Sequence, residues 1–183
     1  MNTALLLVDI QNDYFPGGKM ELEGSPEASE KANRILSLFR LRNMPLVHIQ
    51  HISARPDASF FISGTEGVEI HVNVKPVSGE LVIKKHYPNS FRDTSLLEHL
   101  RRNNIDHVAI TGMMTHMCID ATTRAAFDHG FQCTVLHDAC ATRDLTFGSE
   151  IVPARQVHAA FLAALGAVYA KIVSTDEFIA GLG

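Results

Sequence analysis

The sequence lacks the cysteine pattern of either a disulfide framework or a structural zinc site. Its three cysteines, Cys118, Cys133 and Cys140, are an odd number, and no two of them stand at the CxxC spacing of zinc ligands. Disulfide-rich domains and structural zinc sites depend on such patterns. We therefore expect at least one free thiol.

Long apolar runs are also absent. No stretch reaches the ~20 apolar residues that a membrane-spanning helix needs. Met1 to Thr3 lead directly into an apolar stretch that starts at Ala4, without the basic segment and long apolar region of a secretory signal. We therefore expect a cytoplasmic protein that has no membrane partner.

The chain has no concentration of positive charge. The formal net charge is −4, and the nearest approach to a basic cluster is the pair Arg101 and Arg102, which suits the solvated end of a helix. Binding to phosphate groups requires clustered Lys and Arg. The sequence therefore disfavours a nucleic-acid partner.

The sequence does contain an alternation of strand and helix patterns. Its 183 residues suit a single domain, residues 1–183, and its composition is ordinary for an α/β protein. Helical stretches between strands indicate right-handed βαβ units. We predict a three-layer doubly wound sandwich, in which a six-stranded, mainly parallel sheet of order 3-2-1-4-5-6 carries helices on both faces. The expected strands are 4–9, 46–52, 81–85, 108–111, 131–137 and 168–173, and the expected helices are 25–42, 94–103, 118–130, 153–165 and 175–182.

One long segment, residues 53–80, has no clear periodicity. It is rich in Ser, Gly, Pro and isolated charges. A segment of this length without regular structure inside a compact domain is usually a functional loop or lid.

Three reactive side chains stand at the ends of different predicted strands. Asp9 follows the first strand, Lys85 closes the third, and Cys118 lies beyond the fourth. Each has an ordinary explanation when taken alone: a helix cap, a solvated lysine and a packed thiol. Ligands of doubly wound sheets bind beyond the carboxyl ends of the strands, at the switch point between strands 1 and 4. Asp9 and Cys118 should therefore meet there, and the long side chain of Lys85 can reach them.

Cys118 is expected to begin the helix that ends at Gly130. The free N–H groups and the dipole of a helix N-terminus stabilise negative charge, which lowers the pKa of a thiol and favours its nucleophilic form. The same N–H groups could hold an oxyanion.

The motifs together resemble the isochorismatase-like cysteine hydrolases, a family that includes nicotinamidases and N-carbamoylsarcosine amidases. The resemblance covers nearly the whole chain. It rests on four motifs in the order typical of the family: DIQNDY from Asp9, KHYPNSF from Lys85, GMMTHMC ending at Cys118, and the pair Thr122 and Arg124.

The resemblance implies a catalytic triad of Asp9, Lys85 and Cys118. Lys85 is preferred to Lys84 because its spacing to Phe91 fits the family motif. The resemblance also implies a cis peptide between Met113 and Met114, and an oxyanion hole formed by the backbone N–H groups of Met114 and Cys118. The implied assembly is a homodimer or a larger homo-oligomer.

The expected reaction is hydrolysis of an amide-type C–N bond in a small molecule, through a thioester on Cys118. In this scheme Asp9 is the base and Lys85 lowers the thiol pKa. Tyr14 and His51 are candidates to line the substrate pocket. No cofactor is expected.

A bound metal is disfavoured by the sequence after the second strand. His48 and His51 point to opposite faces of a strand by parity, so the two rings diverge. Nicotinamidases carry a metal-binding Asp-X-His motif in this region, whereas this chain has His51-Ile52-Ser53. The departure argues against nicotinamide as well as against a metal.

Two alternatives remain open at this point. True isochorismatases cleave a vinyl ether by acid catalysis and characteristically lack the cysteine, so here Asp9 would act as the acid. The other alternative is a binding or scaffold protein that has kept the fold without catalysis.

Overall fold

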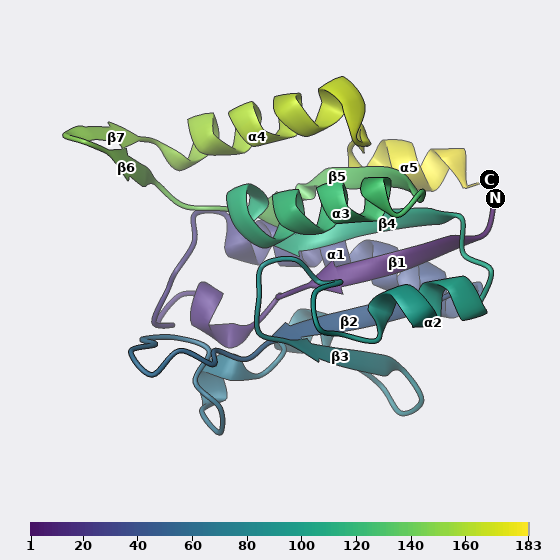
Figure 1. The fold of residues 1–183 in the computed structure, drawn as a ribbon, viewed down its shortest axis with the longest axis horizontal. Helices are drawn as coiled ribbons and strands as arrows, with labels where there is room; N and C mark the ends of the chain where they lie inside the picture. The colour runs from purple at the N-terminus through teal and green to yellow at the C-terminus, as the bar shows by residue number, and fades with distance from the viewer. Residues whose placement is uncertain (183) are drawn as a thin grey trace.

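The computed structural model describes residues 1–182, which are built around a six-stranded parallel sheet (Figure 1). The strand order is β3-β2-β1-β4-β5-β8, and every neighbouring pair is parallel. This is the predicted order, because β8 is the sixth strand of the sheet. The strands are β1 (Thr3–Val8), β2 (Leu46–His51), β3 (Leu81–Lys85), β4 (His107–Met113), β5 (Gln132–Ala141) and β8 (Lys171–Val173).

Helices cover both faces of the sheet and make the predicted three layers (Figure 1). Side chains of α1 and α5 belong to the hydrophobic cluster on one face, and those of α2, α3 and α4 to the cluster on the other. The helices are α1 (Ser25–Leu41), α2 (Leu96–Arg102), α3 (Asp120–Asp128), α4 (Ala154–Val168) and α5 (Thr175–Gly181).

Strand β1 lies at the centre of the sheet, and all six of its residues are buried. Leu6 and Val8 face one hydrophobic cluster, while Leu5 and Leu7 face the other. A strand covered on both faces needs apolar residues at every position, which explains the continuous run in the sequence.

The switch point of the sheet lies between β1 and β4, where Val8 pairs with Gly112. Gly112 has φ of +125°, and a Cβ at this position would collide with the backbone carbonyl of Val8. Only glycine permits so close an approach. Because the strands are parallel, the carboxyl ends of β1, β3 and β4 all lie at the same edge of the sheet.

A two-stranded antiparallel hairpin, which the sequence did not predict, follows β5. It consists of β6 (Leu145–Phe147) and β7 (Glu150–Val152). Figure 1 shows it projecting from the body beyond the beginning of α4. We call residues 145–152 the arm.

The segment 53–80 contains two short 3-10 turns, Glu66–Val68 and Val72–Val74, and is otherwise irregular. The segment is fixed against the DIQNDY motif that starts at Asp9, because the Asp13 carboxylate accepts a hydrogen bond from the Phe61 N–H at 2.6 Å. Phe61 is consequently buried, although it lies in a polar segment.

Among residues 1–182, no helix combines the length and the apolar character that crossing a membrane would require.

Candidate active site

Cys118 lies within a helical segment and not at its first residue. A π-helical turn, Thr115–Ile119, precedes α3, and the peptide between Met113 and Met114 is cis, as the resemblance implied. The predicted helix start at Cys118 was therefore too late by three residues. The turn directs the thiol inward, where the residue is 3% exposed.

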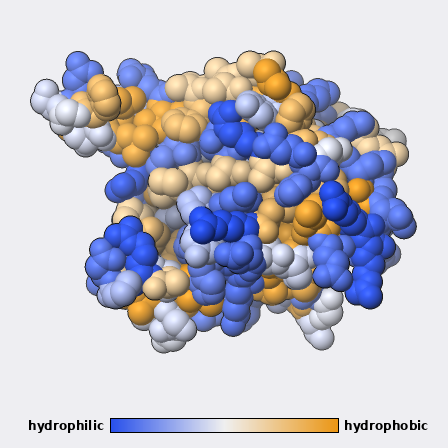
Figure 2. All heavy atoms as spheres, viewed as in Figure 1, coloured by the Kyte–Doolittle hydropathy of each residue, from blue (hydrophilic) through white to orange (hydrophobic). Residues whose placement is uncertain are grey.

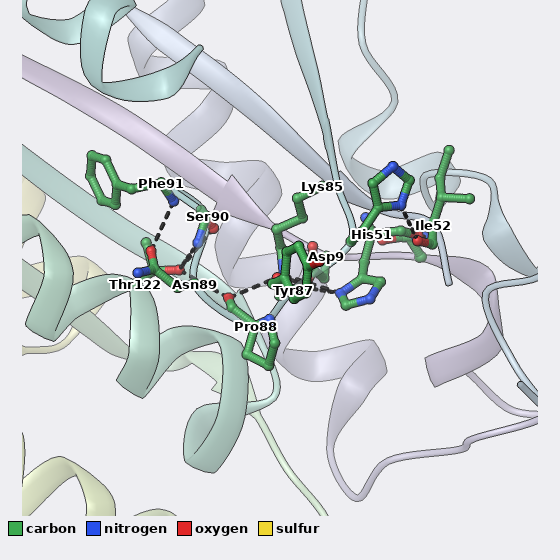
Figure 3. A network of polar contacts seen from close by, with 12 residues as sticks. Asp9, His51, Ile52, Lys85, Tyr87, Pro88, Asn89, Ser90, Phe91 and Thr122 are labelled. Carbon is green, nitrogen blue, oxygen red and sulfur yellow. Dashed lines mark hydrogen bonds and ion pairs between the residues drawn. The ribbon is translucent and has the colours of Figure 1, made fainter. Parts of the chain in front are cut away.

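Folding brings Asp9, Lys85 and Cys118 together, as predicted. The Lys85 Nζ lies 2.8 Å from the Asp9 Oδ2, and both side chains are fully buried (Figure 3). The Cys118 Sγ lies within 4.8 Å of an Asp9 carboxylate oxygen and of a His51 ring nitrogen. Residues more than 100 positions apart in the chain thus form one compact polar cluster.

The Lys85 ammonium is held by acceptors on three sides besides Asp9. It donates to the backbone carbonyls of Tyr87 at 2.9 Å and Pro88 at 3.2 Å, and it lies 3.2 Å from the His51 Nδ1. Lys84, by contrast, is exposed. Of the two lysines, Lys85 is therefore the one that lies beside Asp9, and its acceptors hold the ammonium in place.

The buried ion pair keeps both partners charged. Burial favours the neutral form of Asp9, but the Lys85 ammonium and the His51 ring outweigh it and hold the carboxyl pKa below its ordinary value. Burial likewise opposes a charged Lys85, but Asp9 and Cys118 raise the amine pKa above its ordinary value. The carboxyl group of Asp9 is therefore ionised in the resting state.

The thiol of Cys118 is not pre-ionised, which corrects the expectation from the sequence. Burial and the neighbouring Asp9 carboxylate raise the pKa of the Cys118 thiol well above that of a free cysteine, and Lys85 opposes this only in part. The resting side chain is therefore a neutral thiol.

The position of His51 is fixed by Gln11. The Gln11 side chain donates to the His51 carbonyl at 2.8 Å and accepts from the His51 N–H at 2.8 Å. The His51 Nδ1 lies 3.2 Å from the Lys85 Nζ and 3.8 Å from the Asp9 Oδ2. His48 points the other way and pairs with Glu80 at 2.9 Å, so the predicted divergence of the two rings is confirmed.

An aromatic wall lies beside the cluster of Asp9, Lys85 and Cys118. The ring of Tyr14 packs on Phe61 at 4.6 Å between centroids, Phe60 lies 4.9 Å from Phe61, and His51 lies 5.7 Å from Phe61. Burial, together with the nearby Asp9 carboxylate, raises the pKa of Tyr14. The sequence analysis included Tyr14 but missed Phe60 and Phe61. Two adjacent phenylalanines within a polar loop were the available signal.

A second layer of hydrogen bonds ties residues 86–90, which follow Lys85 and which we call the lysine loop, to α3. The Thr122 hydroxyl lies 2.8 Å from the Ser90 hydroxyl and accepts from the Ser90 N–H at 3.1 Å (Figure 3). Thr122 is one turn beyond Cys118 on α3. Ser90 follows the two carbonyls that hold Lys85. Sequence reasoning could not single out these carbonyls, because every residue has one.

The N–H of Met114 forms no hydrogen bond among residues 1–182, and it adjoins the turn that carries Cys118. A free N–H beside a nucleophile is suited to stabilise developing negative charge.

A divalent metal does not fit this cluster. Asp9, His51 and Cys118 offer ligand atoms at suitable mutual distances, but the Lys85 ammonium contacts Asp9 and His51 from within the same group. A metal ion bound there would lie against a buried positive charge.

The sequence matches the family model of the isochorismatase domain over residues 3–177. The chain therefore belongs to the isochorismatase family of hydrolases. It is 50% identical over 179 residues to the uncharacterized isochorismatase family protein YddQ of Bacillus subtilis, which covers 98% of this chain and 99% of that protein.

Two further comparisons extend this result. The crystal structure of a protein from Oleispira antarctica superposes with a TM-score of 0.93 at 49% identity, covering 98% of this chain and 96% of that one. Maleamate amidohydrolase of Pseudomonas putida is 28% identical over 154 residues, which are 76% of this chain and 72% of that enzyme.

Proposed function

We propose that this protein is a metal-independent cysteine amidohydrolase that cleaves a C–N bond in a small molecule. The observation that carries the proposal is the buried cluster of the Asp9 carboxylate, the Lys85 ammonium and the Cys118 thiol. The relationship to maleamate amidohydrolase supports amide chemistry within the family.

In the first half of the reaction, the Cys118 Sγ attacks the carbonyl carbon of the amide while Asp9 accepts the thiol proton. The carbonyl electron pair moves to oxygen, and the N–H groups of Met114 and Cys118 stabilise the oxyanion. When the oxyanion collapses, the C–N bond breaks, and Asp9 returns the proton to the leaving nitrogen. The products of this half are a free amine and a thioester.

In the second half, a water molecule attacks the thioester carbon and Asp9 accepts its proton. The C–S bond then breaks, a carboxylic acid leaves, and the proton returns to the sulfur. Asp9 thus acts as base and acid in turn, which is why an ionised resting carboxylate matters.

Lys85 supplies the charge that this cycle needs. It holds Asp9 ionised before the attack, and it stabilises the sulfur as negative charge develops there. The His51 ring lies beside the cluster, and Tyr14 with Phe60 and Phe61 forms an apolar wall for the remainder of the substrate.

The electrostatics of Asp9 weigh against vinyl ether cleavage. That reaction requires a protonated carboxyl as its acid, whereas Lys85 holds the pKa of Asp9 below its ordinary value. An ether-cleaving enzyme would also leave the thiol without a role.

Trapping of the thioester tests the proposal directly. The protein is incubated with a panel of small primary amides and N-carbamoyl compounds, ammonia release is measured, and intact mass spectrometry follows the acyl adduct. We expect wild-type protein to release ammonia and to carry the adduct on Cys118, and Cys118→Ala to lose both.

Cys133→Ala is the matched control, because Cys133 is also buried but pairs with Val108 near the start of β4, whereas the cluster lies beyond the end of that strand. It should keep the wild-type rate. Turnover by Cys118→Ala, or an adduct on another cysteine, would remove Cys118 from the mechanism.

A further inference from the structure

The cluster of Asp9, Lys85 and Cys118 is closed to solvent. None of the three residues is more than 3% exposed. Tyr14 and Phe61, which lie beside the cluster, are also buried. A substrate carbonyl must nevertheless come into contact with the Cys118 sulfur, so part of the surrounding structure has to move before the reaction can begin.

The part best suited to move is residues 54–64, within the irregular segment 53–80. All of these residues except Phe61 are exposed or partly exposed, and the one ion pair among them, Arg55 with Asp57, lies inside the stretch. Figure 2 shows hydrophilic residues on the outer surface of the corner where Figure 1 places the segment. Stretches with so few contacts to the rest of a protein open at a low cost in free energy.

The chain on either side of residues 54–64 is held firmly. Before them, the Ile52 N–H donates to the Lys85 carbonyl at 2.9 Å. After them, the carbonyls of Glu66 and Glu69 accept hydrogen bonds from the side chain and the backbone N–H of Asn12, at 2.9 and 3.0 Å. Any movement is therefore confined to the residues between these two anchors.

Phe61 is the residue of this stretch that reaches the site. Its ring packs against Tyr14, with 4.6 Å between centroids, and against His51, with 5.7 Å. Both of those rings lie beside the cluster. The Phe61 ring therefore closes the cluster on the side of the irregular segment.

A single hydrogen bond keeps Phe61 in this position. Its N–H donates to the Asp13 carboxylate at 2.6 Å, whereas its carbonyl accepts from the Ser53 N–H at 2.9 Å, inside the same loop. Among residues 1–182, the bond to Asp13 is the one hydrogen bond that joins residues 54–64 to a residue outside 53–65. Breaking it would free the stretch from the body of the protein.

The backbone of Phe61 is strained in the closed position. Its φ is +56°, in the left-handed region that bulky residues avoid. Strained residues persist only where surrounding contacts hold them, and they are common in clamps and switch segments. Loss of the bond to Asp13 would therefore let Phe61 relax away from the site.

Asp13 is itself fixed by two neighbouring loops. One carboxylate oxygen, Oδ1, accepts from the Lys19 N–H at 3.2 Å, while the other accepts from Phe61. Gly67 lies so close that a Cβ at its position would meet the Asp13 Oδ1 at 2.1 Å. Asp13 is thus engaged by the loops around the site, which suits a residue that holds them together.

We propose that residues 54–64 form a lid over the cluster that contains Cys118, and that Asp13 is the positioning residue that latches the lid through Phe61. In the closed state the Phe61 ring keeps solutes away from the thiol. When the bond to Asp13 breaks, the ring withdraws and the substrate enters. The inference rests on the proposed function only for the purpose of the opening, because the opening itself is measured without a substrate.

The rate at which iodoacetamide alkylates Cys118 measures the opening, because a buried thiol reacts only while it is uncovered. Peptide mass spectrometry follows Cys118 and Cys133 separately in the whole protein. We expect Asp13→Ala to raise the rate at Cys118 by about 10-fold or more, which is the effect of losing one hydrogen bond to a charged group. The rate at Cys133 should not change.

Gly67→Ala tests the latch without removing either of its partners. The added Cβ displaces the Asp13 carboxylate, so this variant should also accelerate the alkylation of Cys118. Asp13→Asn keeps an oxygen that accepts from the Phe61 N–H, and it should react at a rate close to that of wild type.

Asp57→Ala and Gly181→Ala are the matched controls. Asp57 carries an exposed carboxylate on the lid itself, and a Cβ at Gly181 would meet no other atom within 4 Å. Both should react at the wild-type rate. The proposal is overturned if Asp13→Ala alkylates Cys118 at the wild-type rate. It is also overturned if Cys133 is accelerated as much as Cys118, because Asp13 would then support the whole fold and not the lid.

Discussion

Lys84 and Lys85 are neighbours in the chain, yet their side chains have opposite surroundings. Lys84 faces solvent, whereas Lys85 is buried against Asp9, His51 and two backbone carbonyls. Strand geometry explains the difference, because successive side chains point to opposite faces. Of these two charges, it is therefore Lys85 that holds down the pKa of the Asp9 carboxyl.

We expect Lys85→Met to lower kcat/KM by about 10³-fold or more, because it leaves the buried Asp9 charge without its partner. Without Lys85, burial raises the pKa of Asp9, so the acid limb of the pH profile moves to higher pH. The profile of kcat/KM against pH for the two proteins measures both effects.

Lys84→Met, which removes the same charge one residue away, should keep both the rate and the profile. An unchanged acid limb in Lys85→Met would contradict the role of Lys85 in holding Asp9 ionised.

At the scale of the elements, Thr122 joins α3 to the loop of residues 86–90 that follows Lys85. Thr122 on α3 bonds Ser90, while Thr123, beside it, is also buried but its hydroxyl has no hydrogen-bond partner among residues 1–182. The two residues thus provide a matched pair for measuring the value of this link.

We expect Thr122→Val to destabilise the protein by about 1–3 kcal/mol, because the buried Ser90 groups lose their partner. Thr123→Val should be neutral or slightly stabilising, since it removes an unsatisfied hydroxyl. Urea unfolding measures the free energy of each variant. If the two substitutions cost the same, the Thr122 link does not stabilise the loop.

A positioning role for Thr122 has a separate readout. If Thr122 positions Lys85 through Ser90 and the two carbonyls, Thr122→Val should shift the pH profile of kcat/KM. Thr122→Ser, which keeps the hydroxyl, should then restore the wild-type profile. A purely structural role would change the stability without moving the profile.

The elements differ in how far the sequence determined them. Strand β1 was predicted closely because burial on both faces leaves a continuous apolar run, and β3 because two lysines mark its end. The positions of Asp9 and Lys85 followed from the ends of these strands. The arm was missed because β6 and β7 have three residues each, too few for a period to appear. The resting state of Cys118 was also missed, because its pKa depends on burial and on Asp9, which lies 109 residues away along the chain.

At the scale of the whole molecule, Glu80 connects three elements. Its carboxylate accepts hydrogen bonds from Arg40 on α1 at 2.7 and 2.8 Å, and it contacts His48 on β2 at 2.9 Å, just before β3 begins. The Arg40 guanidinium, which outweighs burial, lowers the pKa of Glu80 to about 2. The ionised carboxylate thus stabilises the folded state.

We expect this stabilisation to be fully present above the unfolded-state pKa of about 4.5, and to be lost as the pH falls through about 2. Its upper limit is about 3 kcal/mol, given 1.36 kcal/mol per unit of pKa. The free energy of unfolding of wild type and Glu80→Gln, measured from pH 7 down to pH 2, should converge at the acid end.

Glu30→Gln serves as the control. Glu30 is exposed on α1, the helix that also carries Arg40, and it forms no ion pair among residues 1–182. It should follow the wild-type curve. A constant difference between wild type and Glu80→Gln at every pH would mean that the charge of Glu80 does not contribute.

The neutral thiol of Cys118 has a consequence for the life of the protein under oxidative stress. Hydrogen peroxide converts thiolates, and far more slowly thiols, to sulfenic acid and then to irreversible products. A sulfur that gives up its proton only while it attacks a carbonyl presents peroxide with little to oxidise. The protein without substrate should therefore keep its activity after an exposure to hydrogen peroxide that inactivates hydrolases whose cysteine is ionised at rest.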